Sequence, residues 1–250
     1  RKKMMNMELD KNILKRVNEK MGMDENNPFK KIVPALLRKG LDNVNLSMFD
    51  EVTKRELLNA VGDEYVKKGD KSEAIKAYLM AGNKSKLTML GDEYAKESLY
   101  NNAIDVYKLA DSKEKLREVG IKCLTEQRAS EAARAFELID DEEGLVKVGD
   151  LCLERDRKDL AIEVYAKLQD KARLMRLGDR CMQENKLALA AKAYELANES
   201  EKLTKVGDAF LKTGLLSSAL RCYQIADNKT MVNFIRENFS ESDITDRTYM

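Results

Sequence analysis

Apolar and small residues recur along the chain at a fixed interval of 29 residues. Leucine lies four residues before each glycine of the series, alanine lies twelve residues after it, and an aromatic residue lies sixteen after it. Many positions that keep one phase over such a length indicate stacked structural repeats. The glycines of the series are Gly62, Gly91, Gly120, Gly149, Gly178 and Gly207.

Each repeat predicts two helices joined by a short turn. Leu87, Gly91 and Tyr94 fall at i, i+4 and i+7, which places them on one face of a helix. Ala103 and Tyr107 share one face of a second helix, and a polar stretch lies between the two segments. The pattern therefore predicts an all-α solenoid of six helix–turn–helix repeats over residues 54–228.

The repeated glycine predicts a close contact between the two helices of a unit. A glycine in the middle of a helix costs about 1 kcal/mol relative to alanine. A glycine kept in every unit must offset that cost, and we expect the paired helix to approach closely there. The small residue of the paired helix, such as Ala161 opposite Gly149, is the predicted contact.

These residue types and spacings resemble the tetratricopeptide-repeat signature. In the first unit the matching positions are Leu58, Val61, Gly62, Tyr65, Ala74, Tyr78 and Ala81. The match covers roughly residues 54–227, but the unit is shorter than the 34 residues of that family and lacks its closing proline. Short units of this kind are similar to α-solenoid portions of coat and intraflagellar-transport proteins. The resemblance implies a right-handed superhelix whose first helices line a concave face.

The two ends of the chain depart from the repeat. Residues 229–240 repeat the first helix only, with Arg236 where the glycine would be, and this predicts a C-terminal capping helix. We expect residues 241–250 to form a flexible tail. Residues 1–53 predict a basic helical segment that either caps the solenoid or binds a partner, and Ser47 matches a capping box that opens the first repeat helix.

The net charge is close to zero but unevenly distributed. Residues 1–40 hold 11 Lys and Arg against 5 Asp and Glu, whereas the rest of the chain holds 34 against 39. We call this basic N-terminal segment the basic arm. Three interpretations are open for it: a solvated helix face, a contact for an acidic protein, or a contact for RNA on a ribosome. Its candidate contact residues are Lys11, Lys15, Arg16, Lys30, Lys31, Arg38 and Lys39.

Catalytic and metal-binding patterns are not recognisable in the sequence. Histidine, the commonest general base, is absent, and the glycines do not form a phosphate-binding loop. Cys123, Cys152 and Cys181 are 29 residues apart, but they fill a core position of the repeat, and Cys222 fills another. We therefore expect buried structural cysteines, no metal, no cofactor and no enzymatic activity.

Two sets of residues are candidates for binding a partner on the first helices. An aspartate follows the glycine in five of six repeats and predicts a carboxylate column that grips a basic peptide. The alternative is local pairing with lysine four residues later, as in Asp63–Lys67, Asp92–Lys96 and Asp208–Lys212. The second set predicts an apolar patch that is either exposed or covered by another part of the chain. The aspartates are Asp63, Asp92, Asp150, Asp179 and Asp208, and the patch comprises Ile121, Leu124, Val146, Leu153, Met175 and Met182.

The sequence favours an interaction scaffold over other classes of protein. No apolar stretch is long enough to cross a membrane, and the first residues lack the apolar run of a signal peptide, so we expect a cytoplasmic protein. The predicted function is a non-enzymatic adaptor that binds a protein partner, or a second copy as a homodimer. The alternative is a ribosome- or RNA-associated factor that uses the basic arm.

Overall fold

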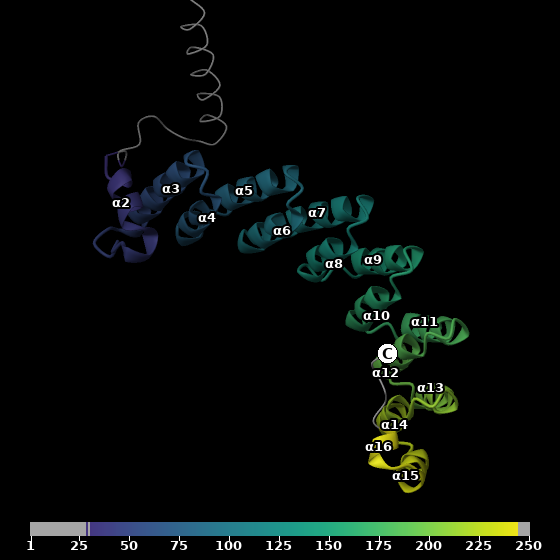
Figure 1. Cartoon of the computed structure of the whole chain (residues 1–250). Coiled ribbons are helices and arrows are strands. Elements are labelled where there is room, and N and C mark those ends of the chain that lie inside the picture. The colour runs from purple at the N-terminus through teal and green to yellow at the C-terminus, as the bar shows by residue number, and fades with distance from the viewer. Residues whose placement is uncertain (1–28, 30, 245–250) are drawn as a thin grey trace, which may run out of the picture. The chain divides into compact units, whose positions relative to one another are not determined.

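The computed structural model describes residue 29 and residues 31–244, and these residues form helices and turns without strands. A short helix, α2 (Val33–Lys39), and a 3₁₀ turn, η1 (Leu41–Asn43), precede a series of helices that follow one another along the chain (Figure 1). Those helices are α3 (Glu51–Lys67), α4 (Lys71–Met80), α5 (Lys84–Lys96), α6 (Tyr100–Leu109), α7 (Lys113–Thr125), α8 (Ala129–Glu137), α9 (Glu142–Glu154), α10 (Lys158–Lys167), α11 (Lys171–Gln183), α12 (Leu187–Ala197), α13 (Ser200–Lys212), α14 (Leu216–Ile225), α15 (Lys229–Asn238) and α16 (Glu241–Ile244).

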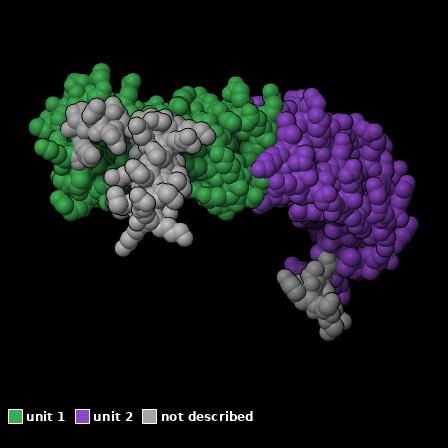
Figure 2. Space-filling view, turned by 90° about the horizontal axis from the view of Figure 1, so that it is seen from above, with its two compact units in different colours: residues 1–119 green, residues 120–250 purple. Residues whose placement is uncertain are grey.

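The chain divides into two compact units, residues 1–119 and residues 120–250 (Figure 2). The boundary falls inside α7. Within each unit the helices pack mainly against their neighbours in sequence, as α3 does against α4 and α11 against α12. This neighbour-to-neighbour packing is that of a solenoid. The division into two units has no signal in the sequence, because the 29-residue phase continues through it.

The repeated glycines allow an aromatic ring of the paired helix to lie against the helix backbone. A Cβ atom at Gly149 would lie 2.4 Å from Cε1 of Tyr165, and the other five glycines of the series meet the corresponding ring in the same way. The predicted close approach therefore exists, and the nearest atoms belong to the aromatic ring and not to the alanine that we expected there. Ala161 is fully buried in the helix-pair core, and the bulky ring is the group that needs the missing side chain.

Tight turns with a left-handed residue separate the helices. Ser98 ends the turn after α5 with φ 59°, and Asp111 has φ 54° in the turn after α6. Small polar residues and glycine tolerate this conformation better than other residues. Asn83, in the turn after α4, caps α5 by accepting a hydrogen bond from the Lys86 amide at 3.1 Å.

The structure corrects the predicted start of the first repeat helix. The N-cap of α3 is Asp50, not Ser47, because the Asp50 carboxylate accepts hydrogen bonds from the amides of Val52 and Thr53, each at 3.0 Å. Two such bonds satisfy amides that have no partner within the helix. The hydroxyl of Thr53 adds a third bond to the same carboxylate at 2.6 Å.

Helix α15 lies within the residues predicted to form the C-terminal capping helix, and Ile235 is fully buried at its core position. The short helix α16 lies where a flexible tail was predicted, and it contacts α14. Residues 245–250 lie outside the described part of the chain. Of the described helices, none combines the length and the apolar character that a membrane span requires.

Candidate interaction site

The repeated aspartates are joined to the second helix of their own repeat. In each case the carboxylate accepts a hydrogen bond from the hydroxyl of the tyrosine fifteen residues later, at 2.6–3.0 Å. The tyrosine is the same residue whose ring lies against the repeated glycine. The five pairs are Asp63–Tyr78, Asp92–Tyr107, Asp150–Tyr165, Asp179–Tyr194 and Asp208–Tyr223.

A basic residue from the following first helix completes most of these pairs. Lys86 donates to Asp63 at 2.9 Å across 23 residues, and Lys115 lies 3.3 Å from Asp92. Lys202 donates to Asp179 at 2.5 Å, and its ammonium lies 5.5 Å from the centre of the Tyr194 ring. We call an aspartate, its tyrosine and this basic residue a polar set.

Arg173 stands at the same position beside Asp150 and Tyr165. Its guanidinium lies 5.8 Å from the centre of the Tyr165 ring and makes its hydrogen bond to Asp170. The charge of Asp150 contributes to the raised pKa of Arg173, after the larger effect of the bond to Asp170. This polar set therefore holds its cation over the ring and not on the carboxylate.

In the polar set of Asp179 the pKa values of the aspartate and the tyrosine are shifted in opposite directions. Burial acts to raise the pKa of Asp179, but hydrogen bonds from Lys202 and Tyr194 and the charge of Lys205 outweigh it, so that this pKa lies below its usual value. Burial, followed by the bond to Asp179, raises the pKa of Tyr194. At neutral pH the set thus contains a carboxylate and a neutral phenol.

These contacts correct the expected local pairing of the aspartates. Lys67 pairs with Glu64 at 3.2 Å, while Asp63 bonds to Tyr78 and Lys86. Among the described residues, none of the three i,i+4 pairs is formed. The aspartate column joins helices within a repeat and across successive repeats, and most of its carboxylates already contact a lysine of the protein itself.

One repeat replaces the whole polar set by apolar or small residues. Ile121 stands at the aspartate position, Phe136 at the tyrosine position and Gly144 at the basic position. A Cβ atom at Gly144 would lie 2.4 Å from Cδ1 of Phe136, so the ring occupies the space that a longer residue needs. We call these three residues the apolar set. We attribute the change of all three members in one repeat to the contacts between these positions, although the aspartate–tyrosine bond also forms without the basic residue, as between Asp208 and Tyr223.

The predicted apolar patch lies on the same helix faces as the aspartates. Val146, Asp150 and Leu153 fall at i, i+4 and i+7 of α9 and therefore share one face. Ile121 is 53% exposed, whereas the other patch residues are partly buried. We call the patch, with its continuation on α13, the apolar column; its residues are Ile121, Leu124, Val146, Leu153, Met175, Met182 and Leu211.

The four cysteines are buried, as the sequence predicted. Burial raises the pKa of Cys123 and of Cys222 to about 11, which favours the unreactive thiol over the nucleophilic thiolate. In the part of the chain that the structure describes, no group of His, Cys, Asp and Glu side chains is arranged to hold a metal ion.

The basic arm is described only in part. Lys31, Arg38 and Lys39 are exposed, and the last two close the C-terminal turn of α2. Within the described residues, none of the three forms an ion pair. The remaining predicted contact residues, Lys11, Lys15, Arg16 and Lys30, lie outside the described part.

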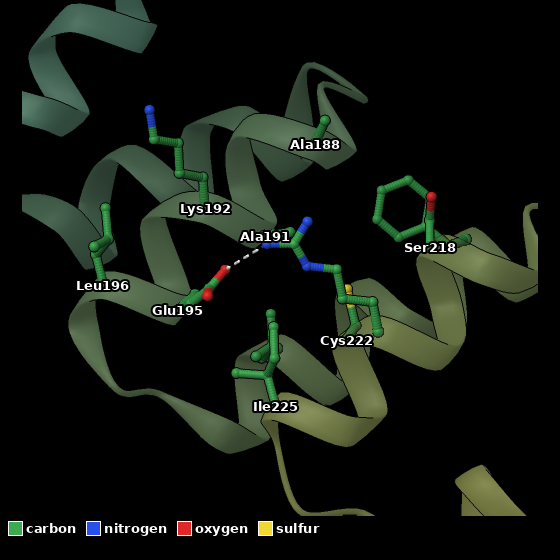
Figure 3. A pocket seen from close by; sticks show the side chains of 11 residues that line it. Ala188, Ala191, Lys192, Glu195, Leu196, Ser218, Cys222 and Ile225 are labelled. Carbon is green, nitrogen blue, oxygen red and sulfur yellow. Dashed lines mark ion pairs between the residues drawn. The ribbon is translucent and has the colours of Figure 1, made fainter. Parts of the chain in front are cut away.

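A groove between α12 and α14 was not predicted (Figure 3). Leu196 and Ile225, each 41% exposed, line it, and Arg221 faces Glu195 at 3.8 Å across it. Ala191, which lines the groove, stands where four of the six repeats carry isoleucine or leucine. Reading the repeats position by position would have revealed this smaller residue.

Comparison of the sequence with protein-family models finds no match, and comparison with curated proteins finds none either.

Proposed function

We propose that this chain is a non-enzymatic scaffold that binds a protein partner, or a second copy of itself, on the faces of its first helices. The observation that carries this proposal is the apolar column of the second unit. Its residues recur at equivalent positions of successive first helices; Ile121 is exposed and the others are partly buried. Apolar side chains that together leave a patch accessible to solvent are typical of protein-interaction sites.

The composition of the column suits a protein partner. Met175 and Met182 have flexible side chains that adapt to different contacts. The neighbouring aspartates Asp150 and Asp179 hold their carboxylates in polar sets, which gives the column a fixed polar border. The resemblance to tetratricopeptide repeats supports the same function and adds a right-handed superhelix of six units with these helices on its concave face.

The proposal is tested by capture of partners on the immobilised chain, followed by mass spectrometry. The variant carrying Met175→Glu and Met182→Glu places two charges in the column and should lose its partners. The matched control carries Leu79→Glu and Met80→Glu, two exposed apolar residues of α4 outside the column. Equal capture by both variants would show that the column is not the binding surface.

Self-association is measured separately by light scattering at micromolar concentration. We expect a dimer that the two methionine substitutions dissociate. A monomer throughout the concentration range would leave a different protein as the partner. A dimer that both substitutions leave intact would assign its interface to another surface.

RNA binding is the second candidate, because Lys31, Arg38 and Lys39 lie on one short segment and form no ion pair with another described residue. Contacts to phosphate weaken steeply as salt rises, whereas apolar contacts do not. Capture repeated with nuclease and at two salt concentrations separates the two functions. Partners that disappear with nuclease would favour the RNA-associated function.

A further inference from the structure

The polar sets reveal which chemical group an aspartate–tyrosine pair of this chain accepts. Asp63, Asp92 and Asp179 each contact a lysine ammonium from the next first helix. At Asp150 the group is the guanidinium of Arg173, held over the tyrosine ring. The same arrangement thus binds a Lys or Arg side chain four times within one molecule.

The last pair of the series has no such cation among the described residues. The Tyr223 hydroxyl donates to Asp208 at 2.7 Å, as in the other pairs. The residue 23 positions later is Met231, and no described basic side chain forms an ion pair with Asp208. One carboxylate of the column therefore keeps its tyrosine but lacks the charged group that its counterparts contact.

A second substitution changes the surroundings of Asp208. In the preceding repeat Lys205, three residues after Lys202, also acts on its aspartate through its charge. The counterpart of Lys205 on α15 is Phe234, which is 44% exposed. Two basic side chains are thus replaced by two apolar ones, of which Phe234 is open to solvent. An exposed aromatic side chain one helical turn from Met231, which stands at the position of the lysine, suits a ligand that is both cationic and apolar.

We propose that Asp208, Tyr223, Met231 and Phe234 form a subsite for a Lys or Arg side chain of a partner polypeptide, next to an apolar residue of that partner. The cation occupies the position that Lys202 takes over Tyr194, and the apolar residue contacts Phe234. Leu211, one turn after Asp208 on α13, continues the apolar column into this subsite. The inference rests on the proposed function and specifies the partner chemistry at one end of the column.

The test measures binding of a fluorescein-labelled twelve-residue peptide of alternating Leu and Lys by fluorescence anisotropy. A peptide with Gln in place of every Lys is the matched probe. We expect the wild-type chain to prefer the Lys peptide, and Asp208→Asn to weaken its binding about fivefold, the upper range for an exposed ion pair, without affecting the Gln peptide. The control is Asp227→Asn, which removes an exposed carboxylate near α15 at a left-handed position that asparagine tolerates.

A second variant, Met231→Lys, tests the same subsite without removing the carboxylate. It places a lysine where the other polar sets have one, so it should weaken binding of the Lys peptide by a similar factor while the chain stays folded by circular dichroism. An equal loss of affinity for the Lys peptide in Asp208→Asn and Asp227→Asn would overturn the proposal, because it would show that the peptide responds to the negative charge of the surface in general. A wild-type chain with no preference for Lys over Gln would also overturn it. If the peptide experiment fails but the Met175→Glu, Met182→Glu variant loses its captured partners, the subsite is refuted and the proposed function stands.

Discussion

Two regions of the second unit, separated by one repeat, pack an aromatic ring between helices with different chemistry. In one, Asp179, Tyr194 and Lys202 join the helices through hydrogen bonds. In the other, Ile121 and Phe136 stand at the corresponding positions, and Gly144 admits the ring where a lysine would stand. Both place an aromatic ring against a repeated glycine, so the ring is the common requirement. The polar contacts are an addition that the repeat of Ile121 and Phe136 lacks entirely.

The largest expected effect comes from placing lysine, the usual basic residue of the polar sets, at the corresponding position of the apolar set. Gly144→Lys puts a side chain where Cβ alone would lie 2.4 Å from the Phe136 ring. Overpacking of this kind should lower the free energy of unfolding by about 3 kcal/mol. The matched change Lys202→Ala, at the same position of a polar set, should cost only about 1 kcal/mol. Urea denaturation followed by circular dichroism measures both, and equal costs would refute the distinction between the sets.

Exchanging the two aromatic residues should have a smaller and unequal effect. Phe136→Tyr introduces a hydroxyl beside Ile121, which accepts no hydrogen bond, and we expect a loss of about 2 kcal/mol. Tyr194→Phe removes one hydrogen bond from Asp179 but leaves Lys202 in place, so about 1 kcal/mol should be lost. The same denaturation experiment checks both values. If Phe136→Tyr stabilises the protein, the apolar set is not a consistent alternative.

The smallest effect is a dependence of stability on pH. The pKa of Asp179 in the folded chain lies below that of an unfolded aspartate, near 4. The stability that its charged form contributes is therefore present above about pH 4 and is lost as pH falls through the lower, folded value. Because the side chain is about half exposed, we expect about 0.5 kcal/mol. Thermal unfolding of wild type and Asp179→Asn should differ at pH 7 and coincide near pH 2. A difference that persists in acid would assign it to another cause.

Much of the fold follows from periodicity alone. The positions of Gly149, Ala161 and Tyr165 predict a helix pair, and α9 and α10 form that pair. The sequence also places Cys152 in the core correctly. These predictions succeed because burial of one helix face imposes a period that is visible in every repeat.

The contacts between repeats were harder to predict. Asp63 has lysines both four and 23 residues later, and local spacing favours the nearer one, Lys67. Asp63 bonds instead to the distant Lys86, because the next helix of the stack brings this lysine over the Tyr78 ring. The one clue in the sequence is that Ile121 and Phe136 depart from the consensus in the same repeat. The boundary between the two units leaves no such clue in the sequence, because it depends on how the helices pack and the 29-residue period continues through it.

The most direct test of this interpretation transplants the polar set as a whole. The triple variant Ile121→Asp, Phe136→Tyr and Gly144→Lys is compared with its three single variants by urea denaturation. If the three residues act as a set, the triple variant should be more stable than the sum of the single losses predicts, by at least about 1 kcal/mol. Losses that add without any recovery would contradict the claim that these positions change together because they contact one another.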